Sequence, residues 1–134
     1  MPSMMNSNHD KLVFSYNWNN KLAGKYFTTL RLRNDQRFVQ FQTYEICIRK
    51  KKQDVFFCYA TLIDFKYYRL DQINEFVAGL DTGYPATECR NIIKTMYKNS
   101  KIDWEKQQLV FCLFRKNDKE PVSKVIEFQL EETE

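Results

Sequence analysis

The chain has 134 residues, a formal net charge of +4 at pH 7, and apolar and aromatic fractions of 43% and 16%. This composition is typical of one folded domain and excludes an intrinsically disordered chain. No apolar run reaches the roughly 18 residues that a membrane helix needs, and the first ten residues lack the apolar centre of a secretory signal. We therefore expect a cytoplasmic protein that does not associate with membranes.

We expect a single domain over residues 11–130, preceded by a disordered tail over 1–10 and followed by a frayed tail over 131–134. The chain has only 3 Gly and 3 Pro, which argues against a long flexible linker. The four cysteines are far apart, form no CxxC pair and lie in apolar segments, so we predict buried free thiols. The single histidine falls in the N-terminal tail, and we expect neither a metal site nor a cofactor.

Hydrophobic periodicity and turn residues predict strands and helices in an order dominated by hairpins. Strands are expected at residues 12–16, 26–33, 42–50, 55–64, 108–115 and 122–130. Helices are expected at residues 18–23, 71–80 and 85–98. This order predicts an α+β fold that is mainly β: a small, mostly antiparallel, partly closed barrel of about six strands with about three helices covering an end.

The strand expected at residues 26–33 has two chemically different faces, because successive strand side chains point to opposite sides. Leu30 and Leu32 share an apolar face that can be buried. Two guanidiniums need water, carboxylates or phosphates, so we expect the opposite face to be exposed to a polar, anionic partner. That opposite face carries Phe27, Thr29, Arg31 and Arg33.

The densest cationic run, Arg49 to Lys52, lies at the expected turn between the third and fourth strands. A solvated turn and an edge that contacts a nucleic-acid backbone are both consistent with such a run. A protein-interaction module that uses this hairpin or the last strand as an edge is a further alternative.

The segment from Gly24 to Arg31 resembles the signature of the ASCH domains in the PUA-like superfamily, which is Gly, any residue, Lys, two residues, Glu or Thr, one residue, then Arg. Gly24, Thr29 and Arg31 fall on signature positions, whereas Tyr26 occupies the lysine position. The segments FSYNWNNKLAG, LDQI and IIKTMY are similar to the matching parts of small bacterial amidohydrolases of this family. The resemblance covers about residues 12–115.

The resemblance implies a PUA-like pseudo-barrel with a cleft beside the motif strand, where an RNA segment or a modified nucleoside could lie. We expect the protein to bind RNA or a nucleotide-like ligand there. Thr29 would provide a hydroxyl and Asp81 a polar contact, and Arg31 and Arg33 would contact an anion or a base. Trp18 and Tyr26 would be the apolar walls.

The resemblance also implies an alternative function, hydrolysis of an N-acylated nucleoside such as N4-acetylcytidine. The amidohydrolases of the family are thought to use a Lys, a Thr and a Glu, which correspond to Tyr26, Thr29 and a position near Asp81 or Thr82. A threonine hydroxyl needs an amine or imidazole to take its proton. Lys25 would share a face with Thr29 if the strand is already extended there, so it is the candidate to replace the missing amine.

Overall fold

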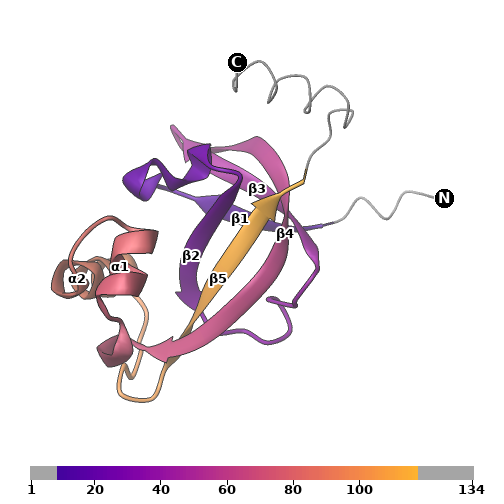
Figure 1. Cartoon of the computed structure of the whole chain (residues 1–134). Coiled ribbons are helices and arrows are strands. Elements are labelled where there is room, and N and C mark those ends of the chain that lie inside the picture. The colour runs from indigo at the N-terminus through magenta and orange to yellow at the C-terminus, as the bar shows by residue number, and fades with distance from the viewer. Residues whose placement is uncertain (1–8, 118–134) are drawn as a thin grey trace, which may run out of the picture.

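The computed structural model describes residues 9–117, in which five strands form one curved sheet (Figure 1). The strands are β1 (Asp10–Phe14), β2 (Tyr26–Leu32), β3 (Thr43–Lys50), β4 (Gln53–Arg69) and β5 (Gln108–Lys116). Their order across the sheet is β1-β3-β4-β5-β2, and only the β1–β3 pair is parallel. The predicted α+β class, mainly β, is confirmed, and the sheet is not closed.

Short helices occupy two places along the chain. The 3-10 helix η2 (Trp18–Ala23) connects β1 to β2, and η3 (Leu70–Gln72), α1 (Glu75–Asp81) and α2 (Ala86–Met96) connect β4 to β5. In Figure 1, α1 and α2 lie together beside β2. The helix expected at residues 71–80 is divided, because Asn74 accepts a hydrogen bond from the Val77 amide (3.0 Å) and so starts α1 as its N-cap.

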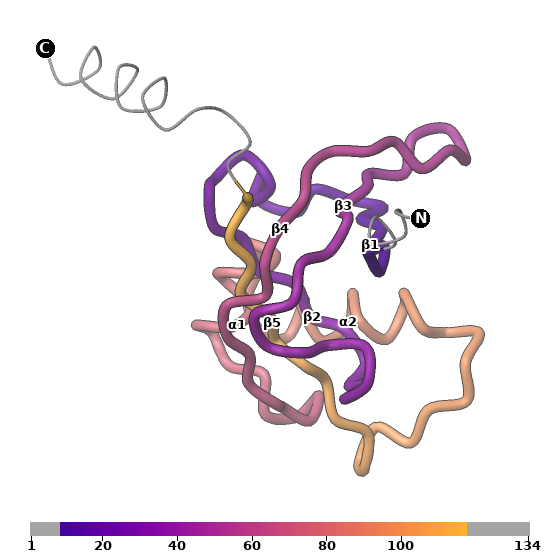
Figure 2. Tube along the Cα trace, turned by 90° about the vertical axis from the view of Figure 1, so that its right-hand side faces the viewer, coloured from indigo at the N-terminus to yellow at the C-terminus, as the bar shows by residue number. Residues whose placement is uncertain are grey.

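Most predicted strands are close to their expected bounds, but β4 continues to Arg69 rather than ending at residue 64. This strand has two successive partners. It pairs with β3 up to Thr61 and with β5 from Ala60 onward, with a register shift between Leu62 and Asp64. Figure 2 shows the β3–β4 hairpin extending away from the rest of the chain. The strand expected at 122–130 lies outside the described residues, as do 1–8 of the expected N-terminal tail and 131–134 of the expected C-terminal tail, whereas β1 already begins at Asp10.

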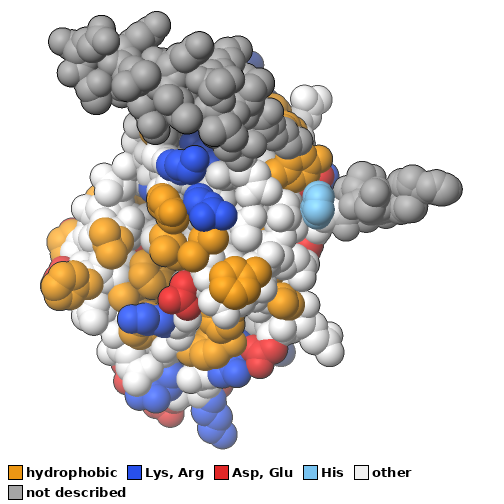
Figure 3. Space-filling model, turned by 45° about the vertical axis from the view of Figure 1, so that its right-hand side comes forward, with side chains coloured by type: hydrophobic (Ala, Val, Ile, Leu, Met, Phe, Trp, Pro, Cys, Tyr) orange, Lys and Arg blue, Asp and Glu red, His pale blue; other side chains and the backbone are white. Residues whose placement is uncertain are grey.

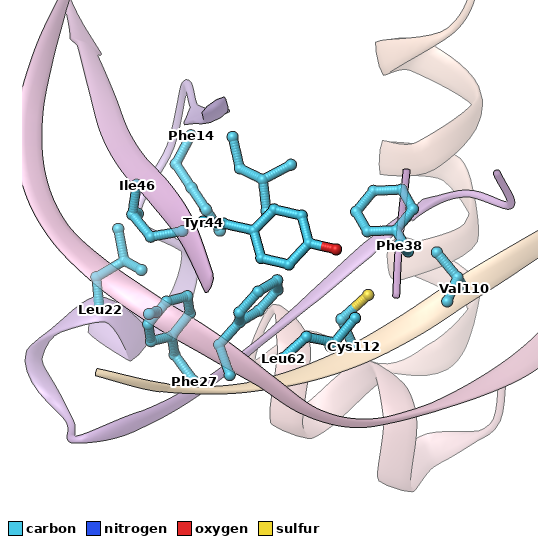
Figure 4. Packing of buried hydrophobic residues seen from close by; sticks show 12 residues of the cluster. Phe14, Leu22, Phe27, Phe38, Tyr44, Ile46, Leu62, Val110 and Cys112 are labelled. Carbon is cyan, nitrogen blue, oxygen red and sulfur yellow. The ribbon is translucent and has the colours of Figure 1, made fainter. Parts of the chain in front are cut away.

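Two hydrophobic clusters lie on opposite sides of the sheet. The inner cluster, drawn in Figure 4, fills the curve of the sheet with side chains from every strand; it includes Phe14, Phe27, Tyr44 and Phe114. The outer cluster packs α1 and α2 against Leu30 of β2 and Leu109 of β5. Because β2 lies between the two clusters, both of its faces are covered.

The expectation that the Thr29–Arg31 face of β2 is open to solvent is therefore wrong. Thr29 is only 4% exposed, and Arg31 is partly buried. Two of the five N–H groups of the Arg31 guanidinium donate within the protein, to the Thr29 hydroxyl (3.0 Å) and to the Val13 carbonyl (2.9 Å), and the guanidinium lies over the Phe14 ring. The predicted burial of Leu30 on the other face is confirmed.

The two edge strands, β1 and β2, are connected by side chains where the sheet fails to close. Arg31 of β2 reaches the Val13 carbonyl of β1, and Arg37, in the loop after β2, donates to the Lys11 carbonyl at 2.7 Å. Two arginines thus bind carbonyl oxygens of the edge strand β1.

Candidate functional site

A buried ion pair joins η2 to the C-terminal end of α1. Lys21 Nζ lies 2.8 Å from Asp81 Oδ1, and each side chain is only 7% exposed. The same carboxylate oxygen accepts a hydrogen bond from the hydroxyl of Thr28, on β2, at 2.9 Å. One carboxylate therefore receives an ammonium and a hydroxyl from two other elements.

Three residues close to this pair in the sequence have positive φ angles. Asn19 and Asn20 have φ values of 58° and 51°, in the left-handed region that Asn tolerates better than most residues. Gly83, just after α1, has a φ of +78°, and a Cβ atom there would lie 2.9 Å from Asn19 Cγ. The Asn19 turn, just before Lys21, therefore lies against Gly83, just after Asp81.

Burial is the largest influence on the pKa of Lys21. Desolvation lowers the pKa of Lys21, the attraction and hydrogen bond of Asp81 partly oppose this effect, and the nearby Arg31 lowers it further. The pKa of Lys21 is therefore below its ordinary value, although its carboxylate partner is in direct contact.

Beside this pair lies a cavity of about 90 Å³ between β1, β2 and α2. Its polar lining includes Thr29, Arg31 and Asp81, and the rings of Trp18 and Tyr97 contribute to its wall. The volume corresponds to about three water molecules, so in this conformation it accepts the edge of a molecule rather than a whole nucleoside.

A wider groove of about 410 Å³ adjoins the cavity, and Tyr16, Trp18 and Thr82 line both. Its aromatic side chains form a continuous cluster: the Tyr16 and Trp18 ring centroids are 5.1 Å apart, and those of Trp18 and Tyr84 are 5.8 Å apart. Tyr16 is 62% exposed and Tyr84 41% exposed. The three rings form an aromatic rim: Tyr16 and Trp18 line both the cavity and the groove, and Tyr84 lines the groove.

The structure brings together four of the residues predicted for the site. Trp18, Thr29, Arg31 and Asp81 line the same cavity although they come from η2, β2 and α1. Lys21 is the residue that the sequence reasoning missed. No periodic signal marks it, because its position depends on the left-handed turn before it and on the partner 60 residues away.

Three other predicted residues lie elsewhere. Tyr26 is 51% exposed and does not line the cavity, since it belongs to the opposite face of β2. Lys25 is exposed in the bend before β2 and does not line the cavity either. Arg33 pairs with Asp35 at 2.7 Å, over the Tyr67 ring, and lines a separate open groove.

The described residues hold no group of three His, Cys, Asp or Glu side chains that could bind a metal ion. Within residues 9–117 no helix is both long and apolar enough to cross a membrane.

All four cysteines are free thiols, as predicted; three are buried and Cys58 is partly buried. On the face seen in Figure 3, hydrophobic side chains lie in several spots among charged ones.

Comparison with protein-family models, curated proteins and solved structures finds no match to this chain.

Proposed function

We propose that this protein binds an RNA segment or a nucleotide-like ligand, with the edge of a base in the cavity beside β2. The observation that carries the proposal is the convergence of a hydroxyl, a guanidinium and a carboxylate on one cavity with an aromatic rim. Asp81 can accept from an exocyclic amine, Thr29 can donate or accept, and Arg31 can contact a carbonyl or a phosphate. These groups match the edge of a nucleobase.

The aromatic rim offers a stacking surface for the ring of the base. A base whose edge enters the small cavity leaves its ring in the adjoining groove, against Trp18 and its neighbours Tyr16 and Tyr84. Stacking of a base on an aromatic side chain contributes about 1–3 kcal/mol, which corresponds to about 5- to 150-fold in affinity. The resemblance of Gly24, Thr29 and Arg31 to the ASCH signature supports the same proposal.

Titration calorimetry with nucleosides and a short single-stranded RNA tests this function. We expect Trp18→Ala to weaken binding at least about fivefold, because stacking is lost. Thr29→Val, which keeps the shape and removes the hydroxyl, is expected to weaken it as well. Tyr26→Ala is the matched control, since Tyr26 is an exposed ring on the opposite face of β2. Absence of binding by the wild type, or equal affinities of Trp18→Ala and Tyr26→Ala, would contradict the proposal.

The buried pair favours a second candidate function, hydrolysis of an N-acylated nucleoside. The amine that the family resemblance places at Tyr26 is missing there, but Lys21 supplies an amine 2.8 Å from Asp81, and both Asp81 and Thr29 line the cavity. Burial lowers the pKa of Lys21, and a lysine must lose its own proton before its amine can take one from a hydroxyl. Lys21, rather than Lys25, would then be the proton acceptor.

Release of acetate from N4-acetylcytidine tests this candidate. We expect Lys21→Met to abolish the activity and Lys25→Met, the control at an exposed neighbouring lysine, to preserve it. If the wild type releases no acetate, the protein is not an amidohydrolase of this kind, and the binding proposal stands on its own test.

A further inference from the structure

The β3–β4 hairpin carries a concentrated positive charge that the cavity does not use. Its two-residue loop is Lys51–Lys52, and Lys50 pairs with Gln53 at its base. The Arg49 guanidinium is neutralised by Asp54 at 2.9 Å. No ion pair or hydrogen bond joins the side chains of Lys50, Lys51 or Lys52 to another residue within 9–117, so the tip presents three charges to solvent.

The backbone of this loop suits other residues better than lysine. Lys51 and Lys52 have φ values of 50° and 67°, both in the left-handed region. A two-residue hairpin with positive φ at both central positions favours Asn-Gly, and side chains with a Cβ atom are strained there. Lysine at both positions therefore places charge at the tip against the local backbone preference, and strain of this kind is often associated with function.

The flank of the hairpin adds exposed apolar and aromatic surface. Val55 on β4 is 43% exposed, Phe57 is 37% exposed, and the Lys116 ammonium lies 4.7 Å from the Phe57 ring centroid. Cationic side chains interleaved with aromatic rings are the combination that binds single-stranded nucleic acids, through phosphate contacts and base stacking.

The position of the hairpin relates it to the cavity. β3 runs beside β1 with Phe14 opposite Ile48, so the hairpin tip lies just beyond the end of β1 from which the chain leads to Tyr16 and Trp18. Figures 1 and 2 both place the hairpin and η2 toward the same end of the sheet. A strand of nucleic acid with one base at the aromatic rim can therefore continue toward the lysines.

We infer that the β3–β4 hairpin binds the phosphates of a single-stranded RNA through Lys51 and Lys52, so that the ligand of the cavity is part of a polymer rather than a free nucleoside. The inference rests on the proposed nucleotide-binding function of the cavity. Each phosphate contact to a single strand contributes about 0.7 to the dependence of log affinity on log salt concentration. Two contacts contribute about 1.4, or about 25-fold in affinity between 1 M and 0.1 M salt.

Lys51→Asn/Lys52→Gly is the decisive variant because it removes both charges and introduces the dipeptide that the turn prefers. We expect a thermal unfolding midpoint at or above that of the wild type. Fluorescence polarisation with a short single-stranded RNA is expected to show about 25-fold weaker binding near 0.1 M salt and a salt slope lower by about 1.4. Nucleoside binding measured by calorimetry is expected to be unchanged.

Lys98→Asn/Lys101→Gly is the matched control, because it removes the same charge from two exposed lysines after α2. We expect its RNA affinity to stay within about threefold of the wild type. If Lys51→Asn/Lys52→Gly binds RNA as tightly as the wild type, or no more weakly than the control variant, the inference is wrong while nucleoside binding still supports the cavity. If the wild type binds neither RNA nor nucleosides, both the inference and the proposed function are wrong.

Discussion

Asp81→Asn is expected to destabilise the protein strongly because it leaves a buried ammonium without its counter-charge. The Lys21 and Asp81 side chains are each 7% exposed, so solvent cannot replace the lost carboxylate. Removal of one partner from a buried ion pair costs about 3–5 kcal/mol. A domain of this size has a free energy of unfolding of about 5–15 kcal/mol, so the variant loses a large share of its stability.

The loss depends on pH in a direction set by the pKa of Lys21. Burial lowers this pKa below its ordinary value of 10.5, and removal of Asp81 lowers it further, since Asp81 is the main group that raises it. Between the lowered pKa and 10.5 the folded state binds fewer protons than the unfolded chain, so the free energy of unfolding rises with pH. This window is wider in Asp81→Asn, and the deficit relative to wild type therefore shrinks as pH rises toward 10.5.

Urea unfolding of four proteins at several pH values measures this effect: the wild type, Asp81→Asn, Lys21→Met and the double variant. The double variant removes both charges, and we expect it to be more stable than Asp81→Asn because no unpaired charge stays buried. If Asp81→Asn loses less than about 1 kcal/mol and the loss does not vary with pH, the assignment of a buried, interacting pair is wrong.

Two further predictions concern the backbone near the site and the sheet interior. Gly83→Ala is expected to destabilise the protein by about 1–3 kcal/mol, because φ is +78° and the new Cβ would meet Asn19. Thermal unfolding measures the loss, and an unchanged midpoint would contradict the close approach of Asn19 to Gly83. Burial raises the pKa of Cys112 to about 12, so we expect iodoacetamide near pH 8 to alkylate it slowly in the folded protein and fast after unfolding. Mass spectrometry measures the two rates, and equal rates would refute the burial.

Local patterns predicted the secondary structure well because they depend on neighbouring residues. The alternation in β2 correctly separated Leu30 from Thr29 and Arg31. The burial of Thr29 and Arg31 could not be predicted, because the Val13 carbonyl and the Phe14 ring that accommodate the guanidinium come from a strand that β2 does not pair with.

The candidate site was predictable only in part for the same reason. Thr29 and Arg31, which the motif of β2 singled out, and the more distant Asp81 line one cavity. Lys21 was missed because its partner Asp81 is distant in sequence, and the packing of the Asn19 turn beside a glycine 64 residues later is also non-local, so no periodicity indicates either contact.

The arginine contacts at β1 also affect how this protein can meet other copies of itself. An edge strand with free carbonyl groups is a template on which another chain can add a strand, and natural sheets protect such edges. Arg31 and Arg37 occupy the Val13 and Lys11 carbonyl oxygens, so two hydrogen bonds that an added strand would need are already made. The guanidiniums that complete the curved sheet therefore also protect its β1 edge from edge-to-edge aggregation.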